Sequence, residues 1–157
     1  MTDTAAVHGS FTIERRYPTT TDRVFAACAD PLLKKSWFAE SDTHELEAFD
    51  SDFRIGGTEC LTYRFGPSTP FPGAKLTNDA VFQDIVDQQR IVTSSRMALK
   101  GRPISVALET IEIAKAGRET SLTCTFQGVF FEGADGPAMR EQGWRDLLDR
   151  LGRSLAS

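Results

Sequence analysis

Cysteine is scarce in this chain of 157 residues, and its spacing does not fit a metal site. The three cysteines, Cys28, Cys60 and Cys124, lie far apart, and none belongs to a Cys-x-x-Cys pair. An odd set of widely separated thiols is typical neither of a disulfide framework nor of a zinc site. We therefore expect free thiols in a reducing compartment, a cytoplasmic location and no bound metal.

Long apolar runs and an excess of positive charge are also missing. No segment approaches the roughly 20 apolar residues of a membrane-spanning helix, and the N-terminus lacks the basic and apolar regions of a signal peptide. Basic side chains number 18 against 22 acidic ones, which gives a net charge of −4. Because nucleic-acid-binding domains normally present a basic face, we expect neither a nucleic acid nor a membrane as a partner.

Recognisable catalytic motifs are absent as well. The chain contains no Gly-x-Ser-x-Gly, His-Glu-x-x-His, Walker or dinucleotide-binding pattern. Its two histidines are His8, in an expected tail, and His44, at the start of an expected strand without a serine or cysteine motif nearby. They are too few and too poorly placed for a triad or a metal site. The sequence therefore assigns no catalytic residue and no cofactor.

Phenylalanine is what the chain has in abundance. It contributes 11 residues, against two tryptophans and two tyrosines, so most of its aromatic bulk carries no polar atom that needs a hydrogen-bond partner. Two interpretations stay open: a core packed with phenylalanine, or an apolar cavity lined by rings.

Hydropathy patterns predict one strand, two short helices, six further strands and one long helix. Alternation predicts a strand over residues 11–17, and Asp30-Pro31 should separate the two short helices, the second with Leu33 and Trp37 on one face. The other strands are expected at residues 44–49, 58–65, 76–87, 90–99, 103–113 and 120–131. In the strand at 103–113, apolar residues occupy even positions up to 108 and odd positions from 111. This change of parity predicts a bulge or bend near Glu109 and Thr110.

The last helix, expected over residues 137–155, is amphipathic. Its apolar stripe contains Trp144, Leu148 and Leu151, Gly143 is expected to let it approach the sheet closely, and Arg140 falls among the polar positions. A helix of this length must lay its apolar side on the sheet. We therefore predict an α+β fold in which a curved antiparallel sheet wraps around the C-terminal helix. It should form a single domain over residues 1–157, with residues 1–8 as a flexible tail.

Several local motifs occur along this order of elements. They are Val24-Phe25, Asp30-Pro31, Trp37-Phe38, a D-x-R-x-G-G hairpin at residues 52–57, Arg90-Ile91-Val92, and Gly143-Trp144 with Leu147, Leu148 and Leu151. The element order resembles the helix-grip fold of the START-like, or SRPBCC, superfamily. The motifs resemble its branch named for the activator of the heat shock protein 90 ATPase, and the resemblance covers nearly the whole chain.

This resemblance implies a hydrophobic cavity between the sheet and the last helix. For every candidate wall residue, plain core packing is the alternative. Polar side chains that could orient a ligand are Arg64, Asp84, Arg96, Glu109 and Tyr63, and burial would raise the pKa of a carboxyl group there. The candidate ligand-binding residues are Trp37, Phe38, Tyr63, Phe65, Phe82, Arg96, Met97, Phe126, Trp144 and Leu148.

Three functions remain open at this point. The favoured one is a START-like domain that binds a small hydrophobic or aromatic molecule. The second is an enzyme resembling the cyclases and hydratases of the superfamily, with Asp84, Glu109 and Tyr63 as candidate polar residues. The third is a chaperone-associated protein that stimulates a heat shock protein 90-type ATPase. The sequence does not decide between a monomer and a homodimer.

Overall fold

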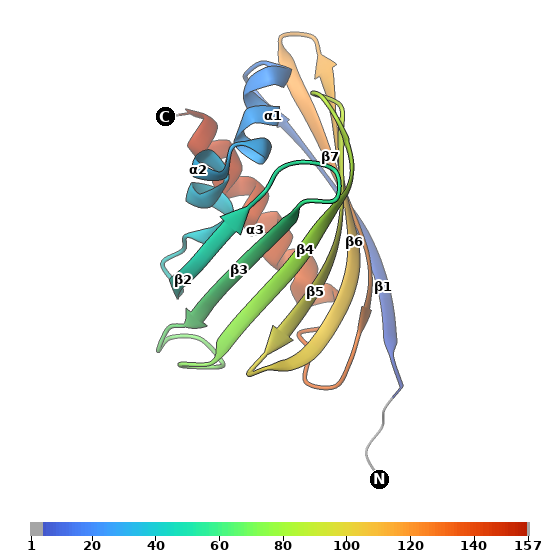
Figure 1. Cartoon of the computed structure of the whole chain (residues 1–157). Coiled ribbons are helices and arrows are strands. Elements are labelled where there is room, and N and C mark those ends of the chain that lie inside the picture. The colour runs from blue at the N-terminus through green and yellow to red at the C-terminus, as the bar shows by residue number, and fades with distance from the viewer. Residues whose placement is uncertain (1–4, 157) are drawn as a thin grey trace.

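A single antiparallel sheet of seven strands forms the frame of the molecule (Figure 1). The computed structural model describes residues 5–156. The strands stand in the order β1-β7-β6-β5-β4-β3-β2, so every neighbour except β1 and β7 is also a neighbour along the chain. Their bounds are β1 Val7–Tyr17, β2 His44–Ser51, β3 Thr58–Phe65, β4 Lys75–Val86, β5 Arg90–Leu99, β6 Arg102–Ala116 and β7 Glu119–Phe130.

The N-terminal strand is longer than predicted. His8 pairs with Val129 and Phe11 with Phe126, so β1 begins at Val7 and lies along β7 for its whole length. The expected tail over residues 1–8 is therefore wrong for Val7 and His8, because β7 offers backbone partners to residues whose side chains give no strand signal. Residues 1–4 lie outside the described part of the chain.

Three helical segments follow β1: α1 Thr21–Ala29, α2 Pro31–Lys34 and the π-helix η1 Lys35–Ala39. Asp30 separates the first two helices as predicted. Its backbone amide donates to the carbonyl of Ala26 at the end of α1, and its carboxylate accepts from the amide of Leu32 at 2.9 Å, at the start of α2. The predicted common face of Leu33 and Trp37 is wrong: Leu33 is 48% exposed and Trp37 only 3%. The wider turn of η1 rotates the two side chains apart.

Three bulges bend the sheet, at Glu47 in β2, Gln83 in β4 and Ile104 in β6. Each leaves one residue without an opposite partner, which increases the local twist. The bulge predicted near Glu109 and Thr110 is in the wrong place, since β6 pairs regularly with both neighbours there. The change of parity occurs at Ile104 instead. Consequently Val106 and Leu108 lie on the outer face, each 43% exposed.

Helix α3, Pro137–Ala156, crosses the inner side of the curved sheet (Figure 1). It packs mainly against β1, η1 and α1. The hydroxyl of Tyr17 donates to the carbonyl of Leu148 at 2.8 Å, and a Cβ at Gly152 would lie 3.1 Å from the Tyr17 ring. Gly152 therefore permits the close approach of the helix to the sheet that was predicted for Gly143. A Cβ added at Gly143 would meet only open space.

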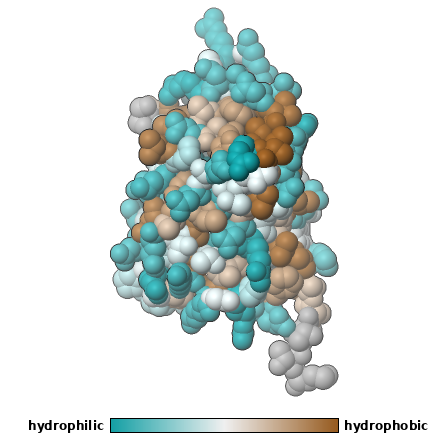
Figure 2. All heavy atoms as spheres, in the orientation of Figure 1, coloured by the Kyte–Doolittle hydropathy of each residue, from teal (hydrophilic) through white to brown (hydrophobic). Residues whose placement is uncertain are grey.

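Hydrophilic and apolar side chains are both found on the surface. Figure 2 shows hydrophilic side chains over most of one face, with separate brown patches among them. Scattered exposed apolar side chains, such as Leu32, Ile55 and Met139, are ordinary for globular proteins. No helix within residues 5–156 is long and apolar enough to cross a membrane.

The contact between α3 and β1 predicts a clear difference between two positions of the helix. Leu148 is fully buried, so Leu148→Ala should lower the free energy of unfolding by about 2–5 kcal/mol, because it leaves a void. Met139, 58% exposed on the same helix, is the control, and Met139→Ala should change it by less than about 0.5 kcal/mol. Urea denaturation measures both, and equal effects would show that α3 is docked differently.

Candidate ligand-binding pocket

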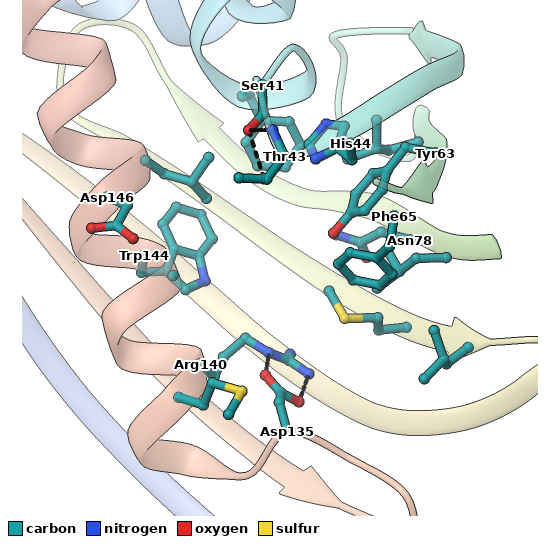
Figure 3. A pocket seen from close by; sticks show the side chains of 18 of the residues that line it. Ser41, Thr43, His44, Tyr63, Phe65, Asn78, Asp135, Arg140, Trp144 and Asp146 are labelled. Atoms are coloured by element: carbon teal, nitrogen blue, oxygen red, sulfur yellow. Dashed lines mark hydrogen bonds and ion pairs between the residues drawn. The ribbon is translucent and has the colours of Figure 1, made fainter. Parts of the chain in front are cut away.

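A pocket of about 510 Å³ lies between the inner face of the sheet and α3 (Figure 3). Strands β3 to β6 form its floor, α3 forms one wall, and the segments at residues 38–44 and 70–71 close its sides. Because α3 packs mainly on β1 and η1, it leaves space over the inner face of β3 to β6. The pocket is thus a consequence of where the helix docks. Its volume falls within the range of small-molecule sites.

Apolar side chains make up most of the lining. Alternate residues of a strand share one face, so β3 contributes Leu61, Tyr63 and Phe65, and β5 contributes Met97 and Leu99. Figure 3 shows Trp144 on α3 and Tyr63 on β3 projecting toward the same space from opposite sides. Other apolar lining residues are Phe38, Leu76, Ile104 and Leu147.

Glu109 places a carboxyl group in this apolar lining. It lies on the inner face of β6 and is 8% exposed. The hydroxyl of Ser95 on β5 donates to its Oε1 at 2.6 Å. Burial raises the pKa of Glu109 to about 7, although the Ser95 hydrogen bond and the charges of Arg140 and Lys34 act in the opposite direction. The carboxyl group of Glu109 therefore titrates near neutral pH.

Arg140 on α3 forms the charged end of the pocket. Its guanidinium holds both carboxylate oxygens of Asp135, at 2.6 and 2.7 Å, and also donates to the hydroxyl of Ser105 at 3.0 Å. Its charge lies 5.0 Å from the centre of the Phe130 ring. The prediction that Arg140 belongs to the polar surface of the helix is wrong, because the bidentate pair with Asp135 compensates its burial.

His44 and Tyr63 form a stacked pair at the opposite side. Their ring centres are 3.7 Å apart, and Nε2 of His44 lies 2.6 Å from the carbonyl oxygen of Ala39. Burial lowers the pKa of His44, which favours the neutral ring, with Nε2 as the donor to that carbonyl. Burial also raises the pKa of Tyr63 to about 12, so its hydroxyl stays protonated. The pair fixes the orientation of a polar hydroxyl inside the pocket.

Several polar atoms of the lining lack a protein partner. Within residues 5–156, no hydrogen bond engages the Tyr63 hydroxyl, Nε1 of Trp144 or Oε2 of Glu109, and Oδ1 of Asn78 is buried without a partner. Buried polar groups are normally satisfied. The arrangement therefore offers hydrogen bonds to a guest molecule. The described residues contain no group of three or more histidine, cysteine or acidic side chains that could hold a metal ion.

Comparison with known families explains this architecture. The family model described as "Activator of Hsp90 ATPase homolog 1-like protein" matches residues 18–156. The chain belongs to this family. The helix-grip fold and the family expected from the sequence motifs are thereby confirmed. No match was found among curated proteins.

Solved structures extend the comparison over nearly the whole chain. The Mll3558 protein of Rhizobium loti is 43% identical, covers 96% of this chain and 99% of its own, and superimposes with a TM-score of 0.85. An uncharacterised protein of Rhizobium leguminosarum is 32% identical, with 99% of both chains covered and a TM-score of 0.90. Protein CV1439 of Chromobacterium violaceum, at 21% identity, covers 94% of this chain and 97% of its own with a TM-score of 0.79, a likeness of fold alone.

Within this helix-grip frame, half of the candidate wall residues line the pocket: Phe38, Tyr63, Phe65, Met97 and Trp144. The other five lie elsewhere. Trp37 is buried, and its Nε1 donates to the carbonyl of Ala27. Leu148 is buried in the hydrophobic core, and Arg96 is exposed on the outer face of β5. Phe82 packs on Phe53 with ring centres 5.0 Å apart, and Phe126 stacks on Phe11 at 4.8 Å.

The polar candidates divide in the same way. Glu109 and Tyr63 line the pocket. Arg64 pairs with Glu47 at 2.6 Å, and Asp84 pairs with Arg90 at 2.6 Å, both outside the pocket. The D-x-R-x-G-G hairpin is structural, since its Asp52 and Arg54 pair with each other.

Many pocket residues were not selected from the sequence, among them the polar residues His44, Asn78, Ser95 and Arg140. The alternation of side chains along a strand could have placed two of them in the pocket. Ser95 lies on the same face as Met97, and Asn78 lies on the same face as Leu76. His44 and Arg140 depend on tertiary partners, Tyr63 and Asp135, that lie on other elements. No sequence pattern indicates those pairings.

The raised pKa of Glu109 predicts how stability changes with pH. The folded state binds a proton more tightly than the unfolded state, so the contribution of Glu109 to stability decreases as pH rises from about 5 to about 8. Glu109→Gln removes this effect. Chemical denaturation measures the free energy of unfolding of both proteins. Between about pH 5 and about pH 8, the value for the variant minus the value for the wild type should increase by roughly 2–3 kcal/mol.

Glu112→Gln is the matched control, because Glu112 lies exposed on the same strand. It should leave the pH dependence of the wild type unchanged. Parallel pH profiles for Glu109→Gln and the wild type would show that the carboxyl at 109 does not have a raised pKa.

Proposed function

We propose that this member of the activator of Hsp90 ATPase homolog 1-like family binds a small hydrophobic or aromatic molecule between the sheet and α3. The observation that carries the proposal is the combination of an aromatic-lined pocket of about 510 Å³ with a few polar atoms that have no partner in residues 5–156. Small-molecule sites typically pair an apolar lining with a small number of oriented polar groups. A pocket that served only packing would be filled by side chains.

The position of Gly143 allows a direct test of the proposal. It lies on α3 in the pocket lining, and a Cβ added there meets no atom within 4 Å. A large side chain at this position would occupy the pocket without displacing the core. Replacing a helical glycine also favours the helix by roughly 0.5–1 kcal/mol, so such variants are expected to fold.

Binding of anthracenemethanol, a neutral fluorescent aromatic alcohol, is the measurement we propose. Gly143→Phe should weaken its affinity by about tenfold or more, because the new ring takes the place of the probe. Gly143→Ala is the control and should bind like the wild type. Thermal unfolding of both variants verifies that they are folded. Wild-type affinity retained in a folded Gly143→Phe variant, or no binding by the wild type, would contradict the proposal.

A second candidate function is proton-transfer catalysis by Glu109. It is favoured by one observation, the carboxyl group whose pKa lies near 7 inside the pocket, since such a value suits a general acid or base. Of the three residues considered for an enzyme, Asp84 lies outside the pocket. If a turnover is found, Glu109→Gln should abolish it while leaving binding intact. An unchanged rate would remove this candidate.

Association with a heat shock protein 90-type chaperone stays a prediction, which the description of the family suggests. It does not depend on the pocket. Co-purification with such a chaperone, together with a measurement of its ATPase rate, tests the association separately. Absence of both binding and stimulation would rule it out.

A further inference from the structure

We infer that the molecule held in this pocket carries a cationic nitrogen, such as a protonated amine, which pairs with Glu109 while its apolar body lies among the aromatic rings. The inference rests on the proposed function and makes it more specific. It follows from the charges around Glu109, the free oxygen of its carboxyl group and the composition of the walls.

Glu109 is a buried acid whose neighbouring cations are already paired elsewhere. The two cations whose charge acts on it are Arg140 and Lys34. Arg140 is held by both carboxylate oxygens of Asp135, and Nζ of Lys34 lies 2.7 and 2.9 Å from the two oxygens of Glu59. Glu109 thus has no counter-ion of its own among residues 5–156. An unpaired buried carboxylate is costly, and a cationic guest would remove that cost.

One oxygen of Glu109 is available to such a guest. Ser95 donates to Oε1, while no described residue donates to Oε2. In its ionised form the carboxylate accepts at both oxygens, so Oε2 can accept a second hydrogen bond. An ammonium group supplies up to three donors and would form a charge-assisted hydrogen bond there.

The aromatic part of the lining agrees with a positive guest. Two of the other acids in the lining are already paired, Asp135 with Arg140 and Asp149 with Arg15 at 3.1 Å, so Glu109 is the buried acid that lacks a counter-ion among residues 5–156. Phe38, Tyr63, Phe65 and Trp144 add ring faces, which attract cations at distances up to about 6 Å. An acid and several aromatic faces in one pocket favour an amine over a neutral or anionic molecule of the same shape.

A matched pair of probes tests this inference. Anthracenemethanol and anthracenemethylamine share one ring system, and only the amine is charged at about pH 8, where Glu109 is largely ionised. The wild type should bind the amine about tenfold or more tightly than the alcohol. In Glu109→Gln, which keeps the shape of the side chain, that preference should disappear. Glu112→Gln, on the exposed face of β6, should keep the preference.

The outcomes separate this inference from the proposed function. If the wild type binds the alcohol as tightly as the amine, the pocket is apolar but does not select cations, and the inference is overturned alone. If Glu109→Gln still prefers the amine, another acid is responsible and the inference is again wrong. If neither probe binds, both proposals fail together. Thermal unfolding verifies that the Glu109→Gln variant is folded.

Discussion

The docking of α3 against β1 and η1 determines the rest of this structure. Tyr17 and Gly152 bring the helix close to the first strand, and Leu148 and Leu151 bury its apolar stripe there. The sheet is too wide for one helix to cover, and its bulges bend the middle strands around the helix. The inner face of β3 to β6 therefore remains available as the floor of a pocket. The docking of α3 at one side of the sheet therefore leaves the pocket over the other strands.

The chemistry of the pocket follows from this geometry. Side chains on the uncovered strands face an apolar space instead of solvent, which raises the pKa of Glu109 to about 7 and that of Tyr63 to about 12. Two charge pairs, Arg140 with Asp135 and Lys34 with Glu59, are internally balanced and leave Glu109 without a counter-ion in the described part of the chain. An aromatic body with one positive nitrogen matches this distribution of surface and charge.

Much of the fold could be predicted from the sequence, because the repeating patterns that specify it are local. Alternation along the strands, the Asp30-Pro31 break and the amphipathic last helix all correspond to observed elements. Features set by tertiary contacts could not be predicted. The bulge at Ile104 depends on pairing with β5, the burial of Arg140 depends on Asp135, and the π-helical turn separates Leu33 from Trp37. The same limit applies to the pocket, since aromatic composition does not distinguish Phe65 in its wall from Phe82 in the core.

The most direct test of the account is a crystal structure of the protein soaked with anthracenemethanol. The account predicts electron density for the three fused rings between Trp144 of α3 and Tyr63 of β3, with the fold of the free protein unchanged. Density for the rings only at the outer surface, or a space between α3 and the middle strands filled by side chains of the protein, would contradict it.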